Sequence, residues 1–117
     1  MKRKFEILEK LATPEAVTPS ITATKGEVTS VAGRKVGSTM TLTFAAKSTN
    51  ATAAGSNIFE GNLENYRPKF LVNGVGYIGQ CAGVLQLLGD GTVTIRATGG
   101  NIAANAAIYI SVTYVLA

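Results

Sequence analysis

Apolar and polar residues alternate with a period of two along most of the chain after Thr18. The alternation is most regular near the C-terminus, where an apolar series faces a more polar one: Ile108, Ile110, Val112, Tyr114 and Leu116 against Tyr109, Ser111, Thr113 and Val115. Because successive side chains of a strand point to opposite faces, this pattern predicts a half-buried β-strand. A strand at the end of the chain is expected to be held in a sheet.

The same period recurs in residues 39–44, where threonine alternates with large apolar residues. An earlier strand is expected around Val28 and Val31, and the intervening Gly33-Arg34-Lys35 predicts that the two strands form a hairpin. Further strands are expected at residues 58–63, 69–78, 83–88 and 92–97.

A tight turn is expected at Leu88-Gly89-Asp90-Gly91-Thr92. Asp-Gly favours the primed turn types, whose central residues need positive φ.

Two stretches interrupt this pattern with small, polar, aperiodic residues, namely residues 47–56 and 99–106. Such composition is typical of loops. Loops on a rigid β framework often carry binding residues, so both are candidate contact surfaces.

The first residues follow a different period. Phe5, Leu8 and Ala12 are spaced three and then four apart, and Thr13-Pro14 ends the pattern. This predicts a short amphipathic helix or neck over residues 1–13, ahead of a single domain at 18–117. A helix this short is marginal alone, which leaves two alternatives open: a neck packed against copies of itself, or a tail that is frayed or folded onto its own domain.

Together these elements predict an all-β fold: a compact antiparallel β-sandwich, jelly-roll-like, with a short N-terminal helix; a barrel is the other architecture that such strands form. The 117 residues suffice for one domain with a modest core.

Composition indicates self-association. Hydrophobic residues make up 46% of the chain and charged residues only 15%, against about 25% in an average domain. A monomer with so few charges would expose much uncharged surface, so we expect part of it to contact another copy of the chain.

The net charge is +4, but apart from Lys2, Arg3, Lys4 and Lys10 the basic residues are scattered, so no nucleic-acid partner is expected. No stretch approaches the ~20 apolar residues of a membrane helix, and polar residues interrupt residues 5–10 where a leader would be apolar. We therefore expect synthesis in the cytoplasm without a signal peptide and without membrane insertion.

Few residues suit catalysis or metal binding. The chain has no histidine, and its single cysteine, Cys81, is expected to be a small buried apolar residue. Asp90 is explained by its turn. Glu60 and Glu64, four residues apart, could act as paired carboxylates on sugars, but their surroundings favour solvated loop residues. No cofactor, metal site or catalytic residue is expected, and the chain is predicted not to be an enzyme.

One motif supports a different hypothesis. Gly74-Val75-Gly76-Tyr77-Ile78-Gly79 matches the glycine pattern of dinucleotide-binding folds, which requires a helix at residues 80–88. Arg96-Ala97-Thr98 stands where an acidic ribose ligand is expected, and too few residues follow to complete such a fold. The alternative is that these glycines serve strand bulges or close backbone contacts at a subunit interface.

Tyrosine offers a broad ring and a polar tip for stacking on sugars or for an interface. Tyr66, Tyr77, Tyr109 and Tyr114 are therefore candidates, although no ligand-binding residue is assigned. The alternation assigns Tyr114 to the core and Tyr109 to the surface, and leaves Tyr77 open.

Residues 58–116 resemble the C-terminal head domains of phage virion proteins, such as receptor-binding heads, baseplate proteins and head fibres of phages that infect Gram-positive bacteria. The resemblance rests on four short segments: Leu63-Glu64-Asn65-Tyr66-Arg67-Pro68, taken to open a strand; Gly83-Val84-Leu85-Gln86-Leu87; Asp90-Gly91-Thr92-Val93-Thr94-Ile95; and Ile110-Ser111-Val112-Thr113-Tyr114. The chain departs from those heads at Glu64, where they often have proline.

The resemblance implies a homotrimeric β-sandwich head on a short helical neck, located on the virion, which contacts other virion proteins. Such a head either docks to cell-surface saccharides or simply decorates the virion, in both cases without a cofactor. Two alternatives stay open: a non-viral carbohydrate-binding or adhesin-like module, and a truncated nucleotide-binding enzyme.

Overall fold

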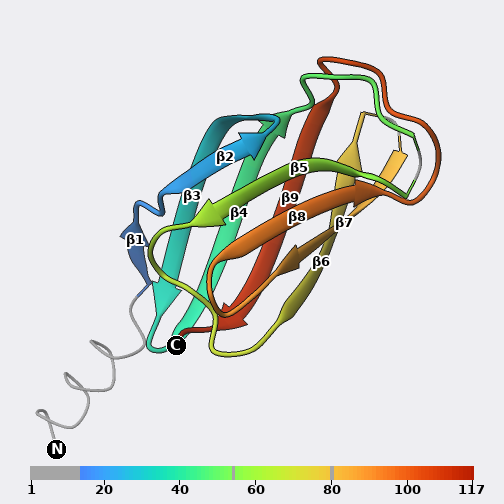
Figure 1. Ribbon diagram of the computed structural model, residues 1–117. Helices are drawn as coiled ribbons and strands as arrows, with labels where there is room; N and C mark the ends of the chain where they lie inside the picture. The colour runs from blue at the N-terminus through green and yellow to red at the C-terminus, as the bar shows by residue number, and fades with distance from the viewer. Residues whose placement is uncertain (1–13, 54, 80) are drawn as a thin grey trace, which may run out of the picture.

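The computed structural model describes residues 14–53, 55–79 and 81–117, and nine β-strands in these segments form one antiparallel sheet (Figure 1). The strands are β1 (Glu15–Val17), β2 (Ile21–Lys25), β3 (Glu27–Val36), β4 (Thr39–Lys47), β5 (Asn57–Leu63), β6 (Val72–Ile78), β7 (Cys81–Leu87), β8 (Thr92–Ala97) and β9 (Ala107–Val115). Their order across the sheet is β1-β3-β4-β9-β6-β7-β8-β5-β2. The prediction of an all-β antiparallel domain is confirmed. Within the described segments, no helix is long and apolar enough to cross a lipid bilayer.

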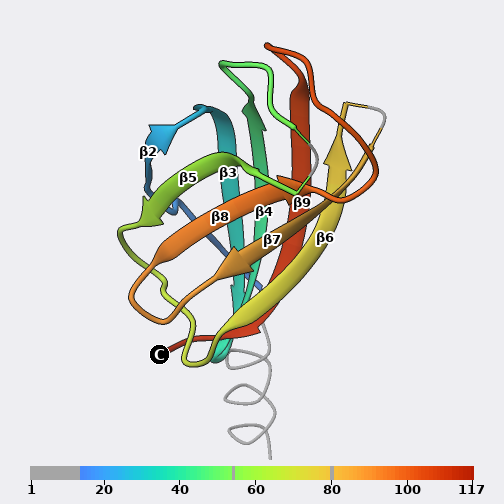
Figure 2. The same ribbon diagram turned by 45° about the vertical axis from the view of Figure 1, so that its right-hand side comes forward.

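The sheet curls into a half-barrel (Figures 1 and 2). One half, β1-β3-β4-β9-β6, faces the other half, β7-β8-β5-β2, and the β6–β7 hairpin joins them. Every second residue of β4 and β9 points into the space between the halves and is buried. Phe44 on β4 meets Phe59 on β5 edge to face, with ring centroids 5.0 Å apart, at the centre of this core.

The predicted hairpin between β3 and β4 is confirmed, but its turn is not where the sequence placed it. Gly33-Arg34-Lys35 lies inside β3, and the turn is at Gly37-Ser38, where Val36 pairs with Thr39. Gly33 is needed for space, because a Cβ there would overlap the side chain of Met40. A glycine that admits a neighbouring side chain was thus mistaken for a turn signal.

The turn after β7 is confirmed in position but not in type. The amide of Gly91 donates to the carbonyl of Leu88 at 2.9 Å, so Gly89 and Asp90 are the central residues. Gly91 has a φ of 92°, whereas neither central residue has positive φ. The prediction of a primed turn is therefore wrong. The geometry is that of a type I turn followed by a glycine in the left-handed region.

The glycine motif of residues 74–79 lies in β6 and its turn, and β7 stands where a dinucleotide-binding fold requires a helix. Gly76 pairs with Ile110, and a Cβ on it would collide with the carbonyl oxygen of Tyr109. Gly76 thus allows β6 to approach β9 within one chain, whereas the sequence had suggested a contact at a subunit interface.

The two ends of the half-barrel differ in what they carry. At the proximal end, Glu15 pairs with Lys35 near the β3–β4 turn, and the amide of Ala117 donates to the carbonyl of Arg67 at 3.0 Å. At the distal end, the loops of residues 48–56 and 98–106 meet (Figure 2). The first strand begins at Glu15, ahead of the expected boundary at residue 18, and the predicted helix of residues 1–13 lies outside the described residues.

Candidate functional site

The two loops predicted at residues 47–56 and 99–106 form one surface at the distal end. In the structure β4 ends at Lys47 and β8 at Ala97, so the loops, here called the distal loop pair, are residues 48–56 and 98–106. The amide of each of Thr52 and Ile102 donates to the carbonyl of the other, both at 2.8 Å, in an isolated antiparallel bridge. These residues are fifty positions apart, so the sequence showed two loops but not their contact. The side chain of Ile102 is buried in the core cluster, so it joins the distal loop pair to the core.

Ser48 fastens this pair and is the residue that sequence reasoning missed. Its side chain is fully buried at 0% exposure. Its hydroxyl donates to the carbonyl of Ala103 at 2.8 Å and accepts from the amide of Ala106 at 3.0 Å. Its backbone carbonyl also accepts from the amide of Asn105 at 2.9 Å. A buried serine in a polar loop has no sequence signal, because its partners come from the other loop.

The distal loop pair presents neutral polar groups. Neither loop contains a charged residue, and threonine and asparagine supply hydroxyls and amides between small alanines and glycines. A shallow hollow of about 230 Å³ is lined by Ala51, Thr52, Ala53, Asn101 and Ile102. Such groups donate and accept hydrogen bonds without favouring either sign of charge, which suits a hydroxyl-rich, neutral ligand.

A second uncharged surface is formed by the outward side chains of three neighbouring strands, here called the β4–β9–β6 face. Its members are Thr39, Thr41, Thr43, Ala45 and Lys47 on β4, Ala107, Tyr109, Ser111, Thr113 and Val115 on β9, and Asn73, Val75 and Tyr77 on β6. Among the outward residues of these three described strands, Lys47 alone is charged. It lies at the distal edge, 3.4 Å from a carboxylate oxygen of Glu27.

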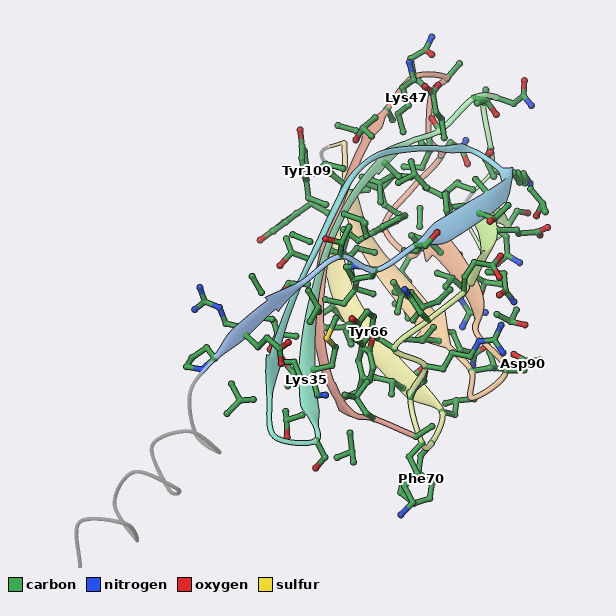
Figure 3. All side chains as sticks on the ribbon, turned by 90° about the vertical axis from the view of Figure 1, so that its left-hand side faces the viewer. Lys35, Lys47, Tyr66, Phe70, Asp90 and Tyr109 are labelled. Atoms are coloured by element: carbon green, nitrogen blue, oxygen red, sulfur yellow. The ribbon has the colours of Figure 1, made fainter. Side chains whose placement is uncertain are left out.

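Tyr77 and Tyr109 dominate the distal half of this face. They are directly paired neighbours on β6 and β9, and their exposed fractions are 68% and 61%. Tyr109 projects away from the sheet (Figure 3). Beside the two rings lies a hollow of about 320 Å³ whose lining includes Ala45, Val75 and Ser111. The prediction that Tyr109 lies on the surface is confirmed, and Tyr77, which the sequence left open, lies there too.

Tyr114 and Tyr66 have structural positions. Tyr114 is buried in the core, as predicted, and its hydroxyl donates to the carbonyl of Tyr66 at 2.8 Å. Burial raises the pKa of the Tyr114 hydroxyl to about 12. Tyr66 is half-buried, with a φ of 53°, and packs against the core.

The segment Leu63-Glu64-Asn65-Tyr66-Arg67-Pro68 connects β5 to β6 at the proximal end, so the expectation that it opens a strand is wrong. Its polar groups are used internally: the Arg67 guanidinium donates from Nε to the carbonyl of Leu63 at 2.9 Å and from Nη2 to the Asn62 side-chain oxygen at 3.1 Å. Pro68 forms a bridge with Leu116. The segment therefore contacts the last residues of the chain, Leu116 and Ala117, and is here called the clasp.

The carboxylates and the thiol do not gather into a site. Glu60 accepts from the side-chain amide of Asn57 at 3.2 Å, while Glu64 accepts from the hydroxyl of Thr22 at 3.0 Å. Four extended residues span about 13 Å, more than the roughly 5–9.5 Å between the carboxyl groups of glycosidases.

Asp90 accepts from the amide of Thr92 at 2.9 Å, which holds the pKa of its carboxyl below the usual value. Cys81 is half-buried against the core rather than fully buried. In the part of the chain that the structure describes, no cluster of three or more metal-ligating side chains occurs.

Comparison with known proteins leaves the geometry as the basis for assigning a function. No protein-family model matches the chain, and no curated protein matches it in sequence.

Proposed function

We propose that this chain is the head domain of a phage virion structural protein, as part of a fibre, tail tip or baseplate. In this proposal it acts as a homotrimer with no catalytic activity and no cofactor. It joins other virion proteins at its proximal end, and its distal loop pair binds saccharides on the host surface. The half-barrel is accordingly classed as a jelly-roll-like sandwich whose two halves face each other across the core.

The observation that carries the proposal is the separation of the two ends. The chain enters the sheet at Glu15 and leaves it at Ala117 at the proximal end, while the distal loop pair lies at the opposite end (Figures 1 and 2). An attachment domain needs this polarity, because one end must be tethered while the other meets its target. The predicted neck of residues 1–13 would continue from the tethered end.

The proximal end also offers a surface for another protein. Phe70 and Leu71, which follow the clasp, are exposed side by side in the chain (Phe70 is labelled in Figure 3). Exposed large apolar side chains that adjoin each other often mark protein contacts. This position suits a contact with a neighbouring virion protein better than a contact with a bacterial surface.

Binding to host walls tests the distal part of the proposal. The full chain is sedimented with purified cell walls from a panel of Gram-positive bacteria, alongside a variant with Thr49→Ala and Asn50→Ala in the distal loop pair. Both side chains are exposed, so the variant should fold. We expect the wild type to bind the walls of at least one host and the double variant to bind them less.

The matched control is Gln86→Ala on the exposed side of β7, which should bind like the wild type. Failure to bind any wall, or equal binding by the distal variant, would contradict the saccharide-binding part of the proposal. A monomeric chain that still binds would favour the non-viral carbohydrate-binding or adhesin-like module.

A further inference from the structure

The exposed apolar side chains of the domain are distributed unevenly. Among the described residues, the large exposed ones are Val36, Phe70, Leu71, Val75, Tyr77, Tyr109 and Val115. All of them lie on the β1-β3-β4-β9-β6 half or in the connection that leads into it. The outer side of the other half carries charge at Glu60 and Arg96, and β1 and β3 carry Glu15, Glu27, Arg34 and Lys35. The surface with few charges is therefore the β4–β9–β6 face, between these charged strands.

We propose that the β4–β9–β6 face is the subunit interface, where a second copy of this chain packs. This inference rests on the proposed homotrimer and specifies which surface forms it. In the assembly the β4–β9–β6 faces of the three subunits face a common axis, and Tyr77 and Tyr109 become buried between subunits. Tyrosine is enriched at such interfaces because a large rigid ring is buried at little entropic cost while its hydroxyl keeps a partner.

The size of the surface fits a protein rather than a sugar. Three strands about 4.8 Å apart, with about 3.4 Å per residue, make the β4–β9–β6 face roughly 400 Å² in outline. A stable interface buries about 800 Å² per partner, so this face supplies about half of that area and residues of neighbouring elements supply the rest. One or two sugar rings stacked on Tyr77 and Tyr109 would cover only a small part of this area and would leave Val75 and Val115 exposed.

The small side chains of the face allow close approach. Most outward side chains of β4 and β9 are threonine, serine or alanine. Two such surfaces can therefore come together without large gaps, and at their centre without buried charges. Next to the face, a hollow of about 580 Å³ is lined by Ala16, Ala32, Gly33, Arg34, Thr41 and Thr43, which leaves room for a projecting side chain of a neighbouring subunit.

The path of the chain supports the same orientation. β1, the first strand, pairs with β3 and so belongs to the half that carries the face. Phe5, Leu8 and Ala12 have the three-four apolar spacing from which a helical neck is predicted, and a neck packed against copies of itself is one of the two alternatives left open above. Copies that meet through these residues would bring their β1 strands, and with them the β4–β9–β6 faces, close to one axis.

The test is to place a charge at the centre of the face and measure the mass in solution by light scattering. Ser111→Arg on β9 and Thr43→Lys on β4 alter exposed side chains, and Gln86→Arg on the exposed side of β7 is the matched control. The wild type and Gln86→Arg are expected at three times 12.1 kDa, about 36 kDa. Ser111→Arg and Thr43→Lys are expected at the monomer mass of 12.1 kDa, with unchanged circular dichroism.

The outcomes distinguish a failure of the proposed interface from a failure of the proposed homotrimer. A wild-type trimer that survives both substitutions overturns this interface and leaves the homotrimer standing, whereas a monomeric wild type overturns both. If the variants do not fold, nitration of wild-type tyrosines decides the question. Tyr77 and Tyr109 should react much more slowly in the trimer than their exposure in a single chain predicts. Rapid nitration in an intact trimer would overturn the inference and leave the face open for a saccharide.

Discussion

Replacing Ser48 with alanine removes the side chain that fastens the distal loop pair. The substitution deletes two hydrogen bonds, to the carbonyl of Ala103 and from the amide of Ala106, in a position with no solvent exposure. Each bond contributes about 1 kcal/mol net, and leaving its partner buried without a replacement costs about 1–3 kcal/mol. The expected loss in the free energy of unfolding is therefore about 2–3 kcal/mol.

This loss can be expressed as a change in the thermal midpoint. An unfolding entropy of about 2.1 cal/mol/K per residue gives about 0.25 kcal/mol/K for 117 residues, so the midpoint should fall by about 8–12 °C. Thermal unfolding followed by circular dichroism measures it, and hydrogen exchange should show faster exchange at the amides of Asn105 and Ala106. Ser56→Ala, at an exposed loop position, is the control and should change stability by less than about 0.5 kcal/mol. A Ser48→Ala variant as stable as this control would refute the proposed fastening.

Other predictions concern the core and its titration. Tyr114→Phe should lose about 1 kcal/mol through its hydrogen bond to Tyr66, measured by urea unfolding. Burial raises the pKa of Tyr114 from the ordinary tyrosine value of 10.0 to about 12 in the folded chain, so its stabilising contribution is complete below pH 10 and lost as the pH rises through 12. The wild type should therefore lose more stability over that range than the variant, and parallel curves would contradict the assignment. Phe59→Ala should cost about 3–5 kcal/mol in the same assay, because its fully buried ring meets Phe44, and a cost below 1 kcal/mol would contradict the core described above. Gly76→Ala should lower the free energy of unfolding by about 1–3 kcal/mol, because the added Cβ collides with the carbonyl oxygen of Tyr109. An unchanged midpoint of urea unfolding would show that β6 and β9 are not so closely paired.

The strand pattern was predictable because one face of most strands is buried. Along β9 the predicted alternation matches the burial of every residue from Ile108 to Val115, since a period of two follows directly from strand geometry. The same reasoning placed Tyr114 in the core and Tyr109 on the surface. Local signals of this kind depend only on neighbouring residues.

Features that depend on distant residues were not predictable. Gly33 resembled a turn residue, but its lack of a side chain leaves space for the side chain of Met40. The burial of Ser48 and the bridge from Thr52 to Ile102 require two loops that the sequence separates by fifty residues. A glycine or serine therefore indicates its role only when the opposing strand or loop is known.

The central claim is that this chain assembles through its own strands, and its mass in solution tests this claim most directly. Light scattering on the purified full chain, over a range of concentrations, should give about 36 kDa, three times the chain mass of 12.1 kDa. A variant lacking the first twelve residues should form fewer trimers if those residues act as the neck. A mass of 12.1 kDa for the full chain at every concentration would contradict the account.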